Sequence, residues 1–327
     1  MNPKKVILDT DIGPDCDDAA AIALLNIFSN AGMCRIIGIG HCTSNPYGVG
    51  AIDAICTYYG NRNVPIGTCS KKNFLDGSTY MTYNRELALR LPNRYRCTQA
   101  ENVLSLYRRA LAEQEDGSVE FIAIGPLNNL SELLHSTPDV YSPLSGCELI
   151  KRKVSCLTAM AGVFRCDSAT MCKQAEQISG SRIEEMKEFN VVCDILAAQD
   201  VAENWPTPKA YVGFEAGLIE TGGRLRMHPD PNHPVKLAYS LYTENGSRYS
   251  WDLLTVEYAI VACCAHFRKS RAGHVSFDAE GRTHWKESEE GEDRYIELAK
   301  EPALIAKELD DLLYSGGTVE IDHLERK

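Results

Sequence analysis

Short apolar segments alternate with segments of helical periodicity along the first half of the chain. The apolar runs at residues 6–8, 36–39 and 121–124 have the length of buried strands, and segments with helical spacing of apolar residues follow them at 19–26, 49–59 and 129–134. Repeated units of strand and helix are typical of a mostly parallel sheet covered on both faces. We therefore predict a Rossmann-like α/β fold with a mostly parallel central sheet flanked by helices.

Two segments interrupt this alternation. Residues 70–102 are rich in Tyr and Arg, and we predict that they form an insertion near the mouth of a site. Residues 274–294 are polar and charged, which indicates solvated loops or a small hairpin.

Residues 302–314 again show helical spacing and predict a last amphipathic helix. We find no tandem repeat and no Gly/Ser linker, so we predict one domain over residues 1–327.

Composition narrows the class of partner. The chain has 327 residues, 44% of them hydrophobic, which is enough to bury a large core. Its formal net charge of −11 excludes wide contact with a nucleic-acid backbone, because such contact requires a basic face. No stretch approaches the roughly 18 consecutive apolar residues of a membrane helix. We therefore expect a cytoplasmic protein that binds a small neutral or cationic molecule, with neither nucleic acid nor membrane as a partner.

The chain has thirteen cysteines, an odd number. They are scattered without the paired spacing of metal ligands, and Cys263 and Cys264 are adjacent, which suits neither a zinc site nor a usual disulfide. Free Cys behaves as a small hydrophobic residue. We therefore predict reduced, buried thiols.

Five carboxylates lie within ten positions between the first predicted strand and the first predicted helix, at Asp9, Asp11, Asp15, Asp17 and Asp18. Like charges this close repel, so several must take up protons or splay apart unless a cation joins them. Capping of the helix N-terminus explains one or two of these acids but not five. Oxygen ligands without a nearby His or Cys favour Ca²⁺ or Mg²⁺ over zinc. The cluster therefore predicts a divalent metal site.

The acidic cluster allows two interpretations. An Asp9-x-Asp11 pair after a buried strand also opens the haloacid-dehalogenase-type phosphatases, in which the first Asp is a phosphorylated nucleophile beside Mg²⁺. Here the pattern continues as Asp-x-Asp-x-x-x-Asp-x-Asp-Asp into a helix. This longer pattern resembles the inosine-uridine nucleoside hydrolase family and is the more specific match.

Further segments resemble this family in the family's order, up to about residue 265: residues 36–45, 63–67, 124–129, 188–190 and 251–252. The resemblance implies the nucleoside hydrolase fold and hydrolysis of the N-glycosidic bond between a nucleobase and ribose. It also implies a nucleoside as the small-molecule partner, and a homodimer or homotetramer.

The resemblance implies a Ca²⁺ site made by Asp11, Asp18, Asp252 and the backbone carbonyl of Ile124. Calcium accepts about 6 to 8 oxygen ligands, so the ribose 2′- and 3′-hydroxyls and a water can complete its shell. Asp11 is in addition expected to act as the general base toward the attacking water.

For the sugar, the resemblance implies five contacts. Asp17 is expected to bind a ribose hydroxyl, Asn45 to lie at the ribose side, and Met160 to lie near the ribose. Glu188 and Asn190 are expected to hold the 5′ end. Without the resemblance, Met160 is also typical of a core residue and Asn45 of a turn.

For the leaving base, many family members place a His immediately before the last calcium Asp as general acid, whereas this chain has Trp251. This departure resembles the purine-preferring subgroup, in which an indole stacks on the base and makes its ring nitrogen easier to protonate by solvent. We expect a second aromatic residue on the other face of the base, with Tyr80 or Tyr83 as candidates. Simple packing is the alternative role for Trp251.

Two other motifs depart from the family. Many members have a His-Gly after the third strand region, where this chain reads Gly67-Thr68-Cys69. Many members also have a Gly-Asn six residues before the motif at 188–190, and Arg182 occupies that spacing here. These departures leave the substrate open between a purine ribonucleoside, a modified nucleoside and another N-riboside. They also leave open a non-catalytic relative that binds a nucleoside or ribose, and the Mg²⁺-dependent phosphatase is the least favoured alternative.

Overall fold

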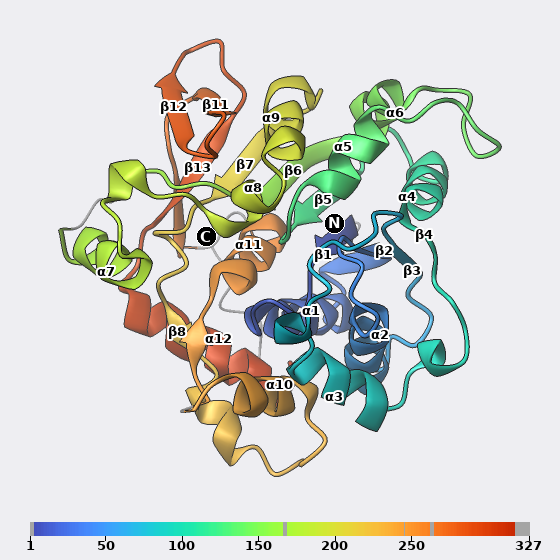
Figure 1. Ribbon diagram of the computed structural model, residues 1–327, viewed down its shortest axis with the longest axis vertical. Helices are drawn as coiled ribbons and strands as arrows, with labels where there is room; N and C mark the ends of the chain where they lie inside the picture. Colours follow the sequence, from blue (N-terminus) through green and yellow to red (C-terminus); the bar gives the residue numbers. More distant parts are fainter. Residues whose placement is uncertain (1–2, 166–168, 245, 262–264, 318–327) are drawn as a thin grey trace.

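The computed structural model describes residues 3–165, 169–244, 246–261 and 265–317 (Figure 1). In this part of the chain a nine-stranded sheet has the order β10-β13-β7-β6-β5-β1-β2-β3-β4. Its strand pairs are parallel apart from β10 and β13, which are antiparallel. The strands are β1 (Lys4–Thr10), β2 (Cys34–His41), β3 (Ile66–Thr68), β4 (Glu101–Asn102), β5 (Val119–Ala123), β6 (Val154–Met160), β7 (Lys209–Val212), β10 (Phe267–Lys269) and β13 (Arg294–Leu298).

Helices pack on both faces of this sheet (Figure 1). Successive side chains of β1 point to opposite faces, so Val6 and Leu8 join one core and Ile7 the other. The helices that contribute to the first core are α1 (Asp17–Asn30), α2 (Gly48–Tyr58), α3 (Tyr83–Arg90), α10 (Pro234–Tyr242), α11 (Trp251–Ile260) and α12 (Pro302–Ser315). Those that contribute to the second core are α4 (Val103–Ala112), α5 (Asn128–Leu134), α6 (Gly146–Lys153), α8 (Phe189–Cys193) and α9 (Ile195–Asn204). Helix α7 (Ala169–Ser179), between β6 and α8 in the sequence, also contributes to the first core through the buried Ala175.

The predicted α/β fold is confirmed as a single α/β domain. The apolar runs at 6–8, 36–39 and 121–124 fall on β1, β2 and β5, with Ile124 just beyond the end of β5. The helical segments that follow them form α1, α2 and α5, and the last predicted helix is α12. Alternation of short apolar runs with helical periodicity was sufficient to find these elements, because each depends on local spacing.

The first irregular segment contains several regular elements, and the second contains the small hairpin that was one of our two predictions for it. Residues 70–102 contain α3, the edge strand β4 and two short 3₁₀ turns, η1 (Ser78–Tyr80) and η2 (Arg94–Arg96). Residues 274–294 contain most of a hairpin of β11 (Gly273–Phe277) and β12 (Thr283–Glu287). Val275 and Phe277 of this hairpin are buried, so its inner face is part of the core rather than solvated loop. Two further 3₁₀ turns, η3 (Ile183–Glu185) and η4 (Gly223–Met227), and the strand pair of β8 (Glu220–Thr221) and β9 (Arg248–Tyr249) complete the described elements.

The described cysteines are all free, but they are not all buried. Cys16, Cys34 and Cys42 lie in the core, whereas Cys97 and Cys147 are exposed, which corrects the prediction of uniformly buried thiols. The adjacent pair at 263–264 lies outside the described residues. Within the described ranges, no helix combines the length and the apolar character needed to cross a bilayer.

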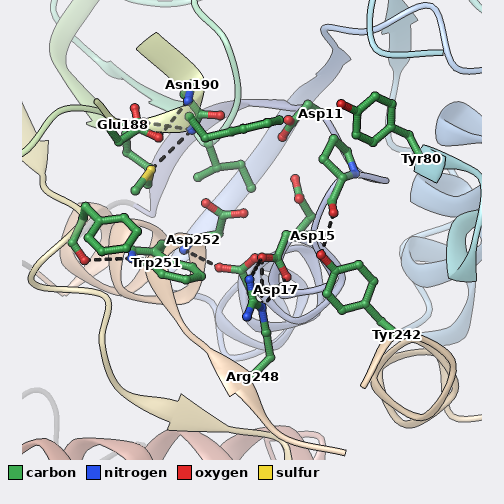
Figure 2. Close-up of a pocket in the computed structure, with 16 residues that line it drawn as sticks. Asp11, Asp15, Asp17, Tyr80, Glu188, Asn190, Tyr242, Arg248, Trp251 and Asp252 are labelled. Atoms are coloured by element: carbon green, nitrogen blue, oxygen red, sulfur yellow. Dashed lines mark hydrogen bonds and ion pairs between the residues drawn. The ribbon is translucent and has the colours of Figure 1, made fainter. Parts of the chain in front are cut away.

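The order of the strands creates a crevice at one edge of the sheet. The chain runs outward from β1 through β2 and β3 to β4 and then returns to β5 on the other side of β1. Ligands of open α/β sheets bind where the strand order reverses in this way, outside the carboxyl ends of the strands. The side chains that follow β1, β5 and β7 at this edge line the pocket drawn in Figure 2.

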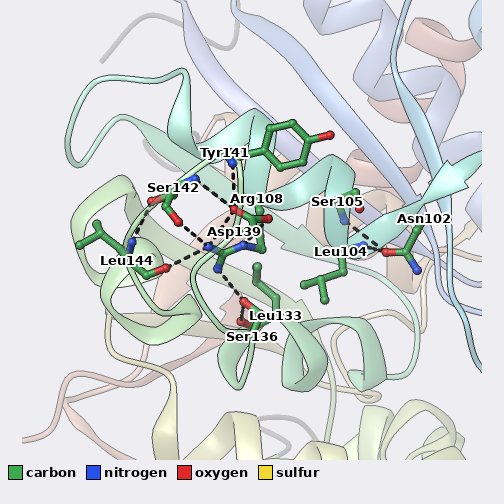
Figure 3. Close-up of polar contacts among 10 residues, drawn as sticks. All are labelled: Asn102, Leu104, Ser105, Arg108, Leu133, Ser136, Asp139, Tyr141, Ser142 and Leu144. Atoms are coloured by element: carbon green, nitrogen blue, oxygen red, sulfur yellow. Dashed lines mark hydrogen bonds and ion pairs between the residues drawn. The ribbon is translucent and has the colours of Figure 1, made fainter.

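A buried arginine holds the loop between α5 and α6 (Figure 3). Arg108 of α4 donates to the Ser136 hydroxyl at 2.8 Å and to the carbonyls of Ser142 and Leu144 at 3.1 and 2.9 Å. Its Nε lies 2.8 Å from Asp139, and this contact lowers the pKa of the Asp139 carboxyl. The side chain of Arg108 is only 2% exposed, so its charge depends on these partners.

Replacement of Arg108 by Met is expected to lower the free energy of unfolding by about 3 kcal/mol, because the loop carbonyls lose charged donors and Asp139 loses its ion pair. Urea unfolding followed by circular dichroism measures this change. Arg109→Met is the matched control, because the neighbouring Arg109 makes a half-exposed ion pair with Glu101 that is worth less than about 1 kcal/mol. Equal losses in the two variants would contradict the anchoring role of Arg108.

Candidate active site

A pocket of about 290 Å³ lies at the carboxyl ends of the central strands. Its polar wall is strongly acidic, with carboxylates from three separate stretches of the chain (Figure 2). Among the described residues that line the pocket, Arg248 is the one with a basic side chain. The acidic side chains are Asp11, Asp15, Asp17, Asp18, Glu188 and Asp252.

Three of these carboxylates form a compact buried group. Asp17 and Asp18 begin α1, Asp252 lies in the first turn of α11, and oxygens of all three lie within 4.8 Å of one another. Burial raises the pKa of each carboxyl well above its ordinary range, and repulsion from neighbouring aspartates of the cluster adds to this shift. The hydroxyl of Thr10 donates to Asp18, and the Asp252 amide donates to Asp17 at 3.1 Å.

This donor set fits a hard divalent cation. Buried carboxylates without a cationic partner are unfavourable when ionised, and oxygen ligands are those that Ca²⁺ and Mg²⁺ prefer. Asp11 and Ile124, which were predicted as further ligands, line the same pocket. Asp17 belongs to the compact group as well, although we predicted it only as a contact of the ribose.

Asp9 lies on β1 and Asp11 comes directly after the end of this strand, but the two carboxyls have different surroundings. Asp11 faces the pocket, no described side chain donates to it, and burial raises its pKa to about 8. Asp9 is fully buried, and its carboxylate accepts hydrogen bonds from Tyr107 and from Asn129, the latter at 2.7 Å. Burial raises the pKa of Asp9 to about 7. Asp11 is therefore accessible to a reacting water, whereas Asp9 is closed off from any substrate.

Glu188 and Asn190 lie together on the wall of the same pocket. Glu188 caps α8 by accepting from the amides of Asn190 and Val191 at 2.7 and 3.1 Å, and burial raises its pKa to about 7. The amide nitrogen of Asn190 donates to the carbonyl of Met160 at 3.1 Å and contacts its sulfur at 3.3 Å. These contacts fix the three side chains against the pocket in the region where we expected the sugar.

Comparison with known proteins identifies the family of this chain. The model of the inosine-uridine preferring nucleoside hydrolase family matches residues 6–310. The chain belongs to this family. It is therefore a ribonucleoside N-glycosyl hydrolase, and the phosphatase alternative is wrong, in agreement with the burial of Asp9.

Solved structures show the same fold in this hydrolase and its relatives. The inosine-uridine preferring nucleoside hydrolase from Bacillus anthracis has a TM-score of 0.67 and 16% identity, covering 97% of this chain and 100% of that chain. The purine-preferring ribonucleoside hydrolase from Gardnerella vaginalis has a TM-score of 0.72 at 16% identity, with the same coverage of both chains. No curated protein matches the chain significantly in sequence.

Two residues predicted to contact substrate do not line the pocket of this hydrolase. Asn45 is buried, and its amide donates to the carbonyl of Tyr80 at 2.7 Å while its side-chain oxygen accepts from the amide of Tyr47 at 3.0 Å. Tyr83 is fully buried, and its hydroxyl donates to the carbonyl of Asp15. Both side chains therefore support the pocket wall from behind, and of the two predicted tyrosines only Tyr80 lines the pocket.

The backbone of the acidic loop is held closely by its surroundings. Gly13 has a φ of +151°, and a Cβ there would lie 2.8 Å from the amide nitrogen of Asn84 and 2.9 Å from the carbonyl oxygen of Tyr80. Tyr242 donates its hydroxyl to the carbonyl of Pro14 at 2.7 Å. A glycine is thus required for the loop to pass this close to the Tyr80 turn.

Trp251 lines the pocket of the hydrolase but is 8% exposed. Its indole N–H donates to the carbonyl of Phe214 at 2.8 Å, and the two rings lie 5.3 Å apart. A Cβ on Gly217 would lie 2.0 Å from the indole, so that glycine packs directly on it. These contacts fix the orientation of Trp251, and the indole N–H is already occupied.

An ion pair at the pocket mouth was missing from our sequence analysis. Arg248 donates through Nε to both oxygens of Asp15 at 2.9 Å and through Nη2 to one of them. Its guanidinium lies 5.2 Å from the centre of the Trp251 ring. Asp15 was recognised only as a member of the acidic cluster, and the available signal for Arg248 was its position three residues before Trp251.

The raised pKa values predict how the chelator-treated protein responds to pH. Asp11 and Glu188 have ordinary values of 3.8 and 4.5 when unfolded but about 8 and about 7 when folded, so the folded state binds more protons between these limits. Stability must therefore fall as pH rises from about 5 to about 8, by up to about 1.4 kcal/mol for each pH unit and each such carboxyl. Thermal unfolding in EDTA measures this dependence.

Addition of Ca²⁺ or Mg²⁺ at about pH 8 should restore stability, because a cation balances the ionised carboxylates. Asp252→Asn should weaken this response, and Asp116→Asn, at an exposed ion pair, should leave it unchanged. A stability that rises with pH in EDTA would contradict the assignment.

Proposed function

We propose that this protein hydrolyses the N-glycosidic bond of purine ribonucleosides in a calcium-dependent reaction. The observation that carries the proposal is the buried group of Asp17, Asp18 and Asp252 in one pocket with Asp11, whose carboxyl accepts from no described side chain. Membership of the nucleoside hydrolase family supplies the reaction type, and the pocket supplies the residues for it.

We assign the cation to Asp11, Asp18, Asp252 and the carbonyl oxygen of Ile124. A divalent cation bound there supplies positive charge that balances the carboxylates and polarises the oxygens it contacts. Four protein positions leave room for several further oxygens, and a high and flexible ligand number favours Ca²⁺ over Mg²⁺. Since an oxygen of Asp17 lies within 4.8 Å of the other carboxylates, a ribose hydroxyl bound to Asp17 would lie beside this site.

In the proposed reaction Asp11 takes a proton from the attacking water, whose oxygen bonds to C1′ of the ribose. The bond from C1′ to the base nitrogen breaks, and its electron pair leaves with the base. Positive charge develops on the sugar, and the surrounding carboxylates stabilise it electrostatically. Glu188 and Asn190 hold the 5′ end of the sugar in this assignment, and Met160, which lines the same pocket, lies near the ribose.

The purine preference rests on the aromatic mouth of the pocket. Trp251 and Tyr80 line it, and a flat purine presents a larger ring surface to them than a pyrimidine does.

We further propose a cytoplasmic homodimer or homotetramer. Free cysteines throughout the described chain fit a reducing compartment, and the exposed apolar residues Val140, Leu196 and Met227 offer surface for self-association. Sedimentation velocity measures the oligomeric state directly.

Asp11→Asn is expected to lower kcat by about 100-fold or more, because the variant keeps the shape of the side chain but loses the base. The assay incubates the protein with Ca²⁺ and a panel of purine and pyrimidine ribonucleosides, and free base and ribose are quantified by chromatography. Asp116→Asn serves as the control at an exposed position. Near-normal turnover by Asp11→Asn would remove Asp11 from its role. Absence of release by the wild type, with calcium bound, would point to another N-riboside or to a binding protein.

Trp251→Ala is expected to reduce kcat/KM for purine nucleosides by about 10-fold or more while pyrimidine nucleosides change less, because stacking on the base is lost. Trp285→Ala in the β11–β12 hairpin is the matched control, because Trp285 does not line the pocket. Equal losses on purines and pyrimidines would show that Trp251 acts by packing alone.

A further inference from the structure

The pocket has a deep acidic floor and a shallower mouth. Asp11, Asp17, Asp18, Glu188 and Asp252 are each at most 5% exposed. At the mouth, the side chains of Arg248 and Asp15 are 30% and 24% exposed, and Tyr80 and Tyr242 are partly exposed. A nucleoside whose sugar hydroxyls lie on the acidic floor must therefore place its base at the mouth, beside the aromatic residues and Arg248 (Figure 2).

Arg248 is held rigidly with one side of its guanidinium unused. Nε and Nη2 donate to Asp15, and no described residue accepts from Nη1. The group lies 5.2 Å from the Trp251 ring and 5.7 Å from the Tyr242 ring, so aromatic surfaces limit its movement. Charged N–H donors with a fixed direction are thus available to a ligand at the mouth.

Three other donors of the pocket already have acceptors, and the Tyr80 hydroxyl is a neutral donor. The Trp251 indole N–H donates to Phe214, the Tyr242 hydroxyl to Pro14, and the Asn190 amide to Met160. No His is among the described residues that line the pocket, so the usual position of a general acid to the base is not filled by an imidazole. Arg248 is the cationic donor that remains for the leaving base.

We propose that Arg248 binds the leaving base through Nη1 and selects 6-oxopurines over 6-aminopurines; this inference rests on the proposed function. When the bond to C1′ breaks, the base takes the electron pair and becomes more negative. The charged donors of Arg248 therefore bind it more strongly in the transition state than in the ground state. Arg248 keeps its protons: water gives its hydroxyl to C1′, and the base gains its proton from solvent.

The selectivity follows from the pattern of acceptors on the base. A 6-oxopurine presents two adjacent acceptors, O6 and N7, which is the edge that arginine recognises in guanine. A 6-aminopurine replaces O6 with an amino donor, which opposes the donors of Arg248. Inosine and guanosine should therefore be better substrates than adenosine.

The test compares kcat/KM for inosine, adenosine and p-nitrophenyl riboside in the wild type and in Arg248→Met, Arg248→Lys and Asp15→Asn. The nitrophenolate leaves readily without help, so it reports on the sugar site alone. In the wild type, inosine should exceed adenosine by about 10-fold or more. Arg248→Met should lose about 10- to 100-fold on inosine and change by less than about threefold on the other two substrates, with kcat carrying most of the loss.

Two variants separate base recognition from structural support. Asp15→Asn removes the charge of the ion pair but keeps a side-chain oxygen that can accept from Arg248, so the ratio of inosine to adenosine should remain within about threefold of the wild-type ratio. Arg248→Lys keeps the positive charge but loses the planar guanidinium with its several N–H donors, and should give an intermediate ratio of inosine to adenosine. Ratios measured on one preparation do not depend on the fraction of folded protein, so a partly unfolded Arg248→Met still gives an answer.

Three results would overturn the inference. Equal losses on all three substrates in Arg248→Met would show that Arg248 only holds Asp15. A wild-type preference for adenosine would contradict the selectivity while leaving the hydrolase activity in place. A wild type that cleaves none of the three substrates would overturn the proposed function itself.

Discussion

The constraint on which this structure depends is the burial of several carboxylates of like charge in one pocket. Asp17 and Asp18 lie in the first turn of α1, Asp252 in the first turn of α11, and Glu188 caps α8. Three helix N-termini therefore converge on the acidic floor, and the partial positive charge at each favours the ionised carboxylates. Helix ends offset only part of the repulsion, so the floor remains a site for a cation.

The sheet explains how these helices meet. Reversal of the strand order between β1 and β5 leaves room at their carboxyl ends, and α1 and α11 pack side by side below that room. Because the floor is built from helix termini and strand ends of the buried core, its geometry is set by the packing of the whole domain. A change in that packing would alter the distances between carboxylates before it altered the fold.

The mouth of the pocket is built differently from its floor. Its residues come from the Tyr80 turn, α10, β9 and the start of α11, and they are more exposed than those of the floor. In the proposed assignment, aromatic faces and one guanidinium at the mouth bind a flat, acceptor-rich ring, without the strong electrostatic constraint of the floor. The same assignment places the hydrolytic chemistry in the buried core, whereas the choice of base depends on side chains of shorter elements.

The sequence by itself determined the α/β alternation and the acidic cluster, because helical periodicity, buried strands and clustered charges are local properties of the chain. The family resemblance added Asp252 and Glu188, which the structure brings to the same pocket. Only the tertiary structure decided that Asn45 and Tyr83 lie behind the wall and that Arg248 meets Asp15 across 233 positions of the chain. Such pairings depend on how distant elements pack, and neither spacing nor residue type records that packing.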